Sequence, residues 1–294
     1  MLALLAALER GLPEAAAGAP RVGVTGAPGA GKSTLLDALV RQLRSRGETV
    51  GIAAVDPSSR LSGGALLGDR ARLRASADDP GVFLRSMATR ERLGGLADAT
   101  WASVAVLAAV FDRVFVETVG VGQSEVEVAE LADTLLFVAQ PGAGDVLQFM
   151  KAGVLEHPDV FAVNKADLGP LAERTANELE AGLALGAGGS GGWRRPVLLV
   201  SARDGTGIDT LIGALDAHRA HLGASGELAA RRLRGRIAFV VDSLQRRYGS
   251  YGLARAGGRD AVVARVRSRA GQGTFALIAE IGGEIEDALR KPEA

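Results

Sequence analysis

The spacing of apolar residues changes repeatedly along the first three quarters of the chain. Short apolar runs rich in β-branched residues are typical of buried strands, and they occur at 22–25, 49–56, 82–85, 113–117, 134–139, 159–164 and 196–200. Between them, apolar residues recur at helical spacing over 34–44, 96–111, 146–155 and 209–221. This alternation predicts an α/β fold, with a mostly parallel sheet of about seven strands flanked by helices. Polar, glycine-rich segments at 60–74 and 86–95 are predicted to be loops.

Strand-like runs stop near residue 223, and the spacing is helical from there on. It marks helical segments around 233–248, 261–266 and 275–289. We interpret this tail as a helical packing or dimerisation module. The alternative is a basic binding patch formed by Arg231, Arg232, Arg234 and Arg236.

At the amino end, the apolar run L-A-L-L-A-A-L is cut short by Glu9 and Arg10. It is too short for a membrane span and lacks the basic start of a secretory signal, so we expect a short packing helix. The predicted parts of the chain are an N-terminal helix at 1–20, a nucleotide-binding domain at 21–222 and a helical region at 223–294.

A glycine-rich loop joins the strand at 22–25 to the helix at 34–44, and it matches the pattern G-x-x-x-x-G-K-[ST]. In this context the loop N–H groups and the helix N-terminus can cradle phosphates, while the lysine reaches the β- and γ-phosphates and the serine hydroxyl binds Mg²⁺. The alternative is a plain turn in a chain with 40 glycines. The candidate phosphate-binding residues are Gly26, Ala27, Pro28, Gly29, Ala30, Gly31, Lys32, Ser33 and Thr34.

Acidic residues stand at the ends of two predicted strands, where open parallel sheets bind their ligands. Asp56 could join a Mg²⁺ shell or position water, and a turn-capping role is its alternative. Glu117 and Gly120 form an acid-x-x-Gly element, as found in sensors of the γ-phosphate. The segment at 60–74 could order around the γ-phosphate, or its basic side chains could be a solvated helix face.

The run at 159–164 leads into N-K-A-D, which comprises Asn164, Lys165, Ala166 and Asp167. A carboxylate at this place can accept both N1–H and N2–H of guanine while the lysine stem lies along the base, and adenine lacks that donor pair. After the last predicted strand, the pair at 201–202 would close over the base edge. The sequence therefore predicts GTP and GDP as ligands, together with Mg²⁺.

Composition narrows the class of protein further. Lys plus Arg and Asp plus Glu each total 34, so no overall field favours a nucleic-acid or membrane partner. The absence of cysteine excludes thiolate metal sites and leaves the cytoplasm as the expected location. His218 and His221 have a spacing that could suit one metal ion, but a polar helix face explains them better.

Together these motifs resemble the MeaB/ArgK family, the methylmalonyl-CoA mutase-associated GTPases, within the signal-recognition-particle and MinD-like class of P-loop proteins. The resemblance covers about 21–201. It is carried by G-A-P-G-A-G-K-S-T, A-V-D-P-S-S, G-G-A-L-L-G-D-R-A-R, E-T-V-G-V-G-Q-S-E, Q-P-G-A-G-D-V-L-Q and V-N-K-A-D. The fourth motif is the most diagnostic, because most GTPases have aspartate where Glu117 stands.

The resemblance implies a homodimeric G-protein chaperone that binds an adenosylcobalamin-dependent acyl-CoA mutase, gates cofactor loading and protects the mutase from inactivation. It also implies roles for single residues. Lys32 contacts phosphates, Ser33 binds the metal, and Gly120 belongs to the γ-phosphate sensor. Asn164, Lys165 and Asp167 recognise the guanine base, and Ser201 and Ala202 close over its edge. The implied catalytic set is Lys32, Asp56, Asp69 and Glu117, and the implied metal set is Ser33, Asp56, Asp69 and Glu117.

No residue of the sequence is an obvious strong base for hydrolysis. Asp56 and Asp69 are the best candidates for positioning water, so we expect slow intrinsic GTP hydrolysis that rises when a partner binds. A kinase linked to arginine or ornithine transport is the rival function, although no separate acceptor base is evident. A nickel-type metallochaperone GTPase is disfavoured because the chain has no cysteine, and a protein-targeting GTPase because it has only three methionines.

Overall fold

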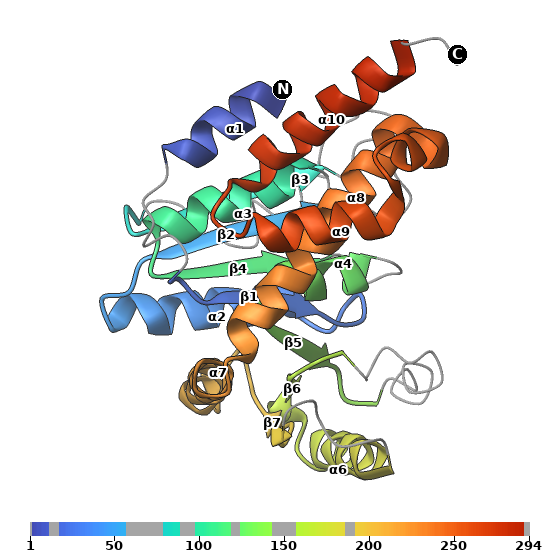
Figure 1. The fold of residues 1–294 in the computed structure, drawn as a ribbon. Helices are drawn as coiled ribbons and strands as arrows, with labels where there is room; N and C mark the ends of the chain where they lie inside the picture. The colour runs from blue at the N-terminus through green and yellow to red at the C-terminus, as the bar shows by residue number, and fades with distance from the viewer. Residues whose placement is uncertain are drawn as a thin grey trace, which may run out of the picture.

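A computed structural model of the chain shows one twisted sheet with helices on both faces (Figure 1). The structure describes residues 2–11, 18–56, 79–88, 98–118, 124–142, 157–185 and 192–290. The loop predicted at 60–74 and the helix predicted at 146–155 lie outside the described residues, as does most of the loop predicted at 86–95.

The sheet has seven strands in the order β3-β2-β4-β1-β5-β6-β7, and every neighbouring pair is parallel. This confirms the predicted α/β class and strand number. The strands β2, β3 and β4 lie on one side of β1, and β5, β6 and β7 lie on the other. In open parallel sheets, ligands bind at the carboxyl ends of the strands where the strand order reverses in this way. The strands are β1 (Arg21–Thr25), β2 (Val50–Asp56), β3 (Val82–Ala88), β4 (Arg113–Glu117), β5 (Thr134–Ala139), β6 (Val160–Val163) and β7 (Val197–Leu199).

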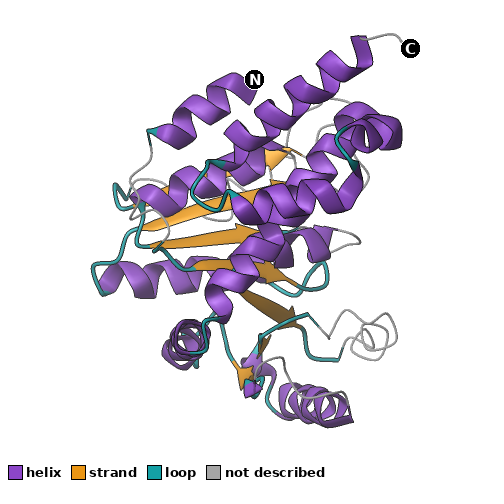
Figure 2. Ribbon diagram, in the orientation of Figure 1, coloured by secondary structure: helices purple, strands orange, loops and turns teal. Residues whose placement is uncertain are grey.

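Two layers of helices bury the two faces of the sheet (Figure 2). Apolar side chains of α2 and α7 form one core with β1, β5 and β6, whereas α3 and α4 pack on the opposite face. A third core joins α6 to β5 and β6. The central strands are apolar on both faces because both faces are covered. These helices are α2 (Lys32–Ser45), α3 (Asp98–Val110), α4 (Ser124–Leu131), α6 (Pro170–Leu185) and α7 (Ile208–Ala224).

The C-terminal helices build a separate core on the side of α3 and α4 (Figure 1). Phe239, Leu244, Ile278 and Ile281 are among its buried residues. The N-terminal helix joins this core, and the carboxylate of Glu9 accepts two backbone N–H groups at the start of α10, at 2.6 and 2.8 Å. These helices are α1 (Leu2–Arg10), α8 (Glu227–Arg255), α9 (Gly258–Ser268) and α10 (Thr274–Arg290).

The four arginines at the start of α8 make contacts within the molecule. Arg231 forms a bidentate ion pair with Asp159, at 2.7 and 2.9 Å, and Arg232 forms one with Asp133. Arg234 pairs with a glutamate of its own helix, and Arg236 donates to backbone carbonyls after α9. Arg231 and Arg232 thus attach α8 to the sheet, and Arg236 attaches it to the segment after α9. With these side chains engaged inside the molecule, the structure argues against a basic binding patch.

The structure corrects several sequence-based expectations. Ser86 and Met87 continue β3 instead of starting a loop, because β3 pairs with β2 over its whole length. The helices α4 and α6 were not predicted. The predicted boundary at 222–223 falls in the last turn of α7, which ends at Ala224.

Candidate functional site

The glycine-rich loop wraps around the start of α2, and its glycines are required by close contacts. Gly26 has φ 136°, and a Cβ atom there would lie 2.1 Å from the Val138 carbonyl oxygen. Gly31 has φ 87°, and a Cβ atom there would lie 2.5 Å from Asn164 Nδ2. Both conformations and both contacts exclude larger residues. The loop is therefore fitted between the ends of β5 and β6.

Lys32 lies at the first position of α2 and is buried. Its ammonium donates hydrogen bonds to the carbonyl oxygens of Gly26 and Ala27, at 2.8 and 3.0 Å. The charge is thus held inside the loop, where the N–H groups of the helix start add positive potential. This arrangement can accept an anion with little rearrangement.

Ser33 and Glu117 meet although 84 residues separate them. The Ser33 hydroxyl donates to Glu117 Oε1 at 2.7 Å, and both residues are buried. The contact follows from the sheet, because Glu117 ends β4 and pairs with Val24 on the neighbouring β1. A hydroxyl and a carboxylate are hard oxygen ligands of the kind that Mg²⁺ prefers, so these two residues fit that ion.

The other predicted acids are placed only in part. Asp56 ends β2, two residues beyond the position that pairs with Glu117, so its backbone lies at the same edge of the sheet. Its side chain is outside the described part of the structure. Asp69 and Gly120 also lie outside the described residues, and their predicted roles stay predictions.

The N-K-A-D motif is joined directly to the glycine-rich loop. Asn164 Nδ2 donates to the Ala30 carbonyl oxygen at 2.9 Å, and Lys165 Nζ donates to that of Gly29 at 3.0 Å. Among the described residues, Lys165 is the one non-glycine residue with a positive φ, 61°. The two motifs, predicted separately, are thus in direct contact.

The turn after β7 completes this region. The Ala202 N–H donates to Asn164 Oδ1 at 3.2 Å, and the Ser201 hydroxyl donates to Asp167 Oδ1 at 2.9 Å. Arg203, which the sequence did not single out, lies 3.5 Å from Asp167 Oδ2. The hydrogen bonds hold the Asp167 carboxylate in a fixed orientation.

Gln140 is a second residue of the site that sequence reasoning missed. It follows β5, and its Oε1 accepts a hydrogen bond from Lys165 Nζ at 3.1 Å. Its position directly after a predicted strand could have indicated a place in the site, because the carboxyl ends of parallel strands meet at one edge of the sheet.

The prediction of a polar helix face for the histidine pair is wrong for His218. His218 is buried, with Nδ1 2.8 Å from Thr134 Oγ1 and Nε2 3.3 Å from an Asp159 oxygen. Burial lowers the pKa of His218 to about 4, against a smaller opposing effect of Asp159. In the described ranges, no group of three or more His, Asp or Glu side chains could hold a metal ion.

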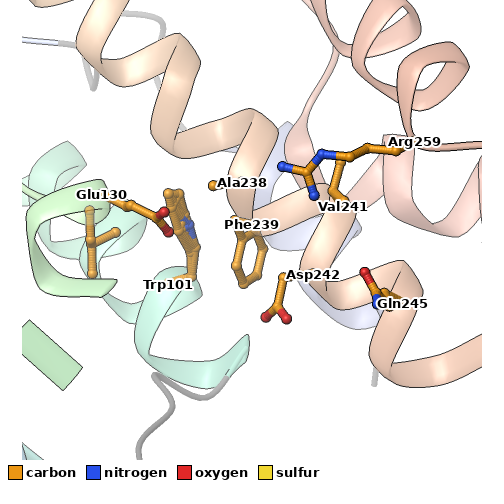
Figure 3. Close-up of a pocket in the computed structure, with 9 residues that line it drawn as sticks. Trp101, Glu130, Ala238, Phe239, Val241, Asp242, Gln245 and Arg259 are labelled. Carbon is orange, nitrogen blue, oxygen red and sulfur yellow. The ribbon is translucent and has the colours of Figure 1, made fainter. Parts of the chain in front are cut away.

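Away from this region, a cavity of about 290 Å³ opens between α3, α4, α8 and α9 (Figure 3). Trp101 and Phe239 stack in it with ring centroids 4.4 Å apart. Glu130, Asp242 and Arg259 also line it. None of the described residues of the predicted nucleotide site is among those that line this cavity.

The match to a family model covers residues 4–248, and that family is described as methylmalonyl-CoA mutase-associated GTPase MeaB. The chain belongs to the MeaB family. With its parallel sheet and glycine-rich loop, it is a P-loop GTPase by family and fold. In the part of the chain that the structure describes, no helix is both long enough and apolar enough to cross a membrane.

Individual relatives agree with this membership. A Pyrococcus abyssi protein named for GTPase activity is 50% identical over 214 residues, which cover 72% of this chain and 66% of that protein. The mouse protein named "Methylmalonic aciduria type A homolog, mitochondrial" is 38% identical over 216 residues, 72% of this chain and 52% of its own. This chain thus spans about two thirds of the first relative and half of the second.

A solved structure, that of a protein named as an LAO/AO transport system kinase, shares the fold over most of the chain. Its TM-score is 0.67 at 27% sequence identity, and the match covers 95% of this chain and 85% of that one. The match extends over the C-terminal helices as well as the sheet, because it covers nearly the whole chain.

Proposed function

We propose that this chain binds GTP and GDP across the joined loops and hydrolyses GTP slowly, and that the nucleotide gates adenosylcobalamin loading of a methylmalonyl-CoA mutase-type enzyme and protects that enzyme. The observation that carries the nucleotide part is the direct contact of the N-K-A-D motif with the glycine-rich loop, at 2.9 and 3.0 Å. Base and phosphates of one nucleotide can then be held together.

In this proposal the phosphate end is bound by the loop N–H groups and Lys32. The ammonium lies beside the loop carbonyls and would neutralise charge on the phosphate oxygens better than water would. Ser33 and Glu117 would hold Mg²⁺, directly or through water. The ion, when bound, adds positive charge beside the phosphates and lowers the barrier to their hydrolysis.

At the base end, Asp167 would accept the two guanine donors. Its orientation is set in advance by Ser201 and Arg203. Asn164 bonds Ala30 on one side and Ala202 on the other, and so keeps the base and phosphate loops at a fixed separation. This preorganisation reduces the entropy lost when the nucleotide binds.

Hydrolysis itself requires a positioned water, and Asp56 and Asp69 are our candidates. Among the described site residues, none is placed as a strong general base. We therefore expect slow turnover until a partner completes the site, since such completion can accelerate hydrolysis by about three to five orders of magnitude.

The mutase part of the proposal is supported by the family description and by the name of the mouse relative. A homodimer joined through the C-terminal helices and a cytoplasmic location are further parts of the proposal.

The experiment is a binding assay between this protein and purified adenosylcobalamin-dependent mutases, with GDP and with a non-hydrolysable GTP analogue. We expect a complex whose affinity depends on the nucleotide, and a GTP hydrolysis rate that rises in the complex. Full-speed hydrolysis by the protein alone, unchanged by any mutase, would contradict the proposal.

The name of the structurally similar LAO/AO transport system kinase favours one second candidate, a kinase linked to amino-acid transport. A kinase transfers the γ-phosphoryl group to an acceptor other than water. Incubation with γ-labelled nucleotide, amino acids and a periplasmic binding protein separates the two functions. Label on inorganic phosphate alone supports the GTPase, and label on an amino acid or protein supports the kinase.

A further inference from the structure

Gln140 touches the base-binding lysine although it belongs to neither nucleotide motif. Its Oε1 lies 3.1 Å from Lys165 Nζ, which also donates to the Gly29 carbonyl oxygen at 3.0 Å. An ammonium can only donate hydrogen bonds, so the amide oxygen of Gln140 must face it. The lysine is thus held between the glycine-rich loop and the end of β5.

We infer that Gln140 is a positioning residue for guanine nucleotides, which fixes the Lys165 ammonium so that the aliphatic stem lies along the base. The inference rests on the proposed function, because a purine must occupy the site for the stem to cover it. Gln140 acts through Lys165 and does not need to touch the nucleotide.

The conformation of Lys165 explains why such support is needed. Its φ of 61° is unfavourable for a residue with a side chain, and such a conformation persists only where the surroundings stabilise it. Of the two oxygens to which its ammonium donates, that of Gly29 belongs to the backbone, and no substitution removes it. Gln140 offers the contact that depends on side-chain identity.

The backbone that carries Gln140 is itself anchored. Two residues further on, the Gly142 N–H donates to Thr175 Oγ1 of α6 at 3.3 Å. The helix α6 begins at Pro170, three residues after Asp167 of the N-K-A-D motif. The segments that carry Gln140 and Lys165 are therefore also linked through α6. Groups held in this way support a binding geometry with little entropic cost.

The inference makes a specific prediction for affinity and rate. GTP and GDP share the same base, so loss of the Gln140 side chain should weaken the binding of both nucleotides to the same extent. Hydrolysis at saturating GTP should change little, because the phosphate end of the site does not include Gln140. We expect KM to rise and kcat to stay within about twofold.

The test measures dissociation constants for a fluorescent GDP analogue with the full chain and with Gln140→Met, which keeps the length of the side chain and removes the acceptor. Loss of a hydrogen bond to a charged group should raise Kd about tenfold. Gln42→Met is the matched control, because the Gln42 amide donates to Asp209 at 2.7 Å, away from the site. We expect its Kd within about twofold of the unsubstituted protein.

A double-mutant cycle with Lys165→Met separates positioning from a general structural role. If Gln140 acts through the ammonium, Gln140→Met should add less than about twofold to the loss already caused by Lys165→Met. Additive losses, or an unchanged Kd in Gln140→Met, would overturn the inference. Thermal unfolding without nucleotide shows whether each variant is folded. If Gln140→Met does not fold, Gln140→Ala takes its place in the same measurements. If the unsubstituted protein itself binds no guanine nucleotide, the proposed function fails instead.

Discussion

At the residue scale, the contact between Ser33 and Glu117 connects the phosphate loop to the strand that precedes the predicted γ-phosphate sensor. The 2.7 Å hydrogen bond buries an acid next to the start of α2. A buried carboxylate is costly unless a hydrogen bond or a cation compensates it. A divalent cation bound beside Glu117 would therefore stabilise its buried carboxylate.

Glu117→Gln tests this role. The amide oxygen can still accept from Ser33, but the negative charge is lost. We expect GTP hydrolysis to fall by about two orders of magnitude, because a charge that acts in the transition state is removed, and GDP affinity to fall less than about tenfold. Single-turnover hydrolysis and GDP titration measure the two effects. Hydrolysis at the original rate would rule out the role of Glu117.

His218 gives a pH-dependent prediction for stability. Burial lowers its pKa to about 4 in the folded protein, while the unfolded chain protonates near 6.5. The unfolded state thus binds the proton first, and stability is lost as the pH falls from 6.5 to 4, by up to about 3 kcal/mol. Asp159, His221 and Arg231 face the ring and influence the same titration.

Urea unfolding at several pH values checks this prediction, with His218→Gln as the non-titrating comparison. The stability of the variant should depend less steeply on pH between 6.5 and 4. An identical pH dependence in both proteins would show that His218 contributes nothing to it.

The sequence indicated candidate residues for the site, because binding of phosphate and of guanine each requires particular residue types. It did not reveal Gln140, since that contact depends on which strands are neighbours in the sheet. His218 was assigned to a polar face because periodicity alone cannot show that a polar side chain has buried partners. Its partners Thr134 and Asp159 lie far away in the sequence.

At the element scale, the strands could be predicted from the sequence because each is a continuous apolar run. The helix α4 was missed because it has only eight residues, half of them polar. The helix α6 starts with Pro170 at its first position and buries Ala172, Ala176 and Leu179, a weak apolar pattern. The strand β3 contains polar residues because it lies at the sheet edge.

The contact between α4 and α8 leads to a prediction on stability. A Cβ atom at Gly235 of α8 would lie 1.9 Å from the Glu130 carbonyl oxygen of α4. Gly235→Ala must push the helices apart, and we expect a loss of about 1–3 kcal/mol in the free energy of unfolding. Chemical unfolding measures it.

Gly213→Ala in α7 is the matched control, since a Cβ atom there meets nothing within 4 Å. Alanine has the higher helix propensity, so this variant should gain up to about 1 kcal/mol. Equal effects of the two substitutions would contradict the close packing of α4 on α8.

At the scale of the whole molecule, α8 connects the C-terminal helices to the GTPase sheet. Ion pairs of Arg231 and Arg232 attach it to the starts of β5 and β6, and Gly235 rests on α4. The C-terminal helices therefore pack directly on α4, a helix of the GTPase domain. The cavity of Figure 3 lies at the same junction, between the two parts.

The central claim is that one site, built from the glycine-rich loop and N-K-A-D, selects guanine nucleotides. Calorimetry with GDP, ADP and xanthosine diphosphate, on the unsubstituted protein and Asp167→Asn, tests it most directly. We predict that GDP binds at least about a hundredfold more tightly than ADP, because two charge-assisted hydrogen bonds distinguish them. Asp167→Asn should then prefer xanthosine diphosphate, whose 2-oxo group needs a donor. Equal affinity for GDP and ADP, or an unchanged preference in Asp167→Asn, would contradict the claim.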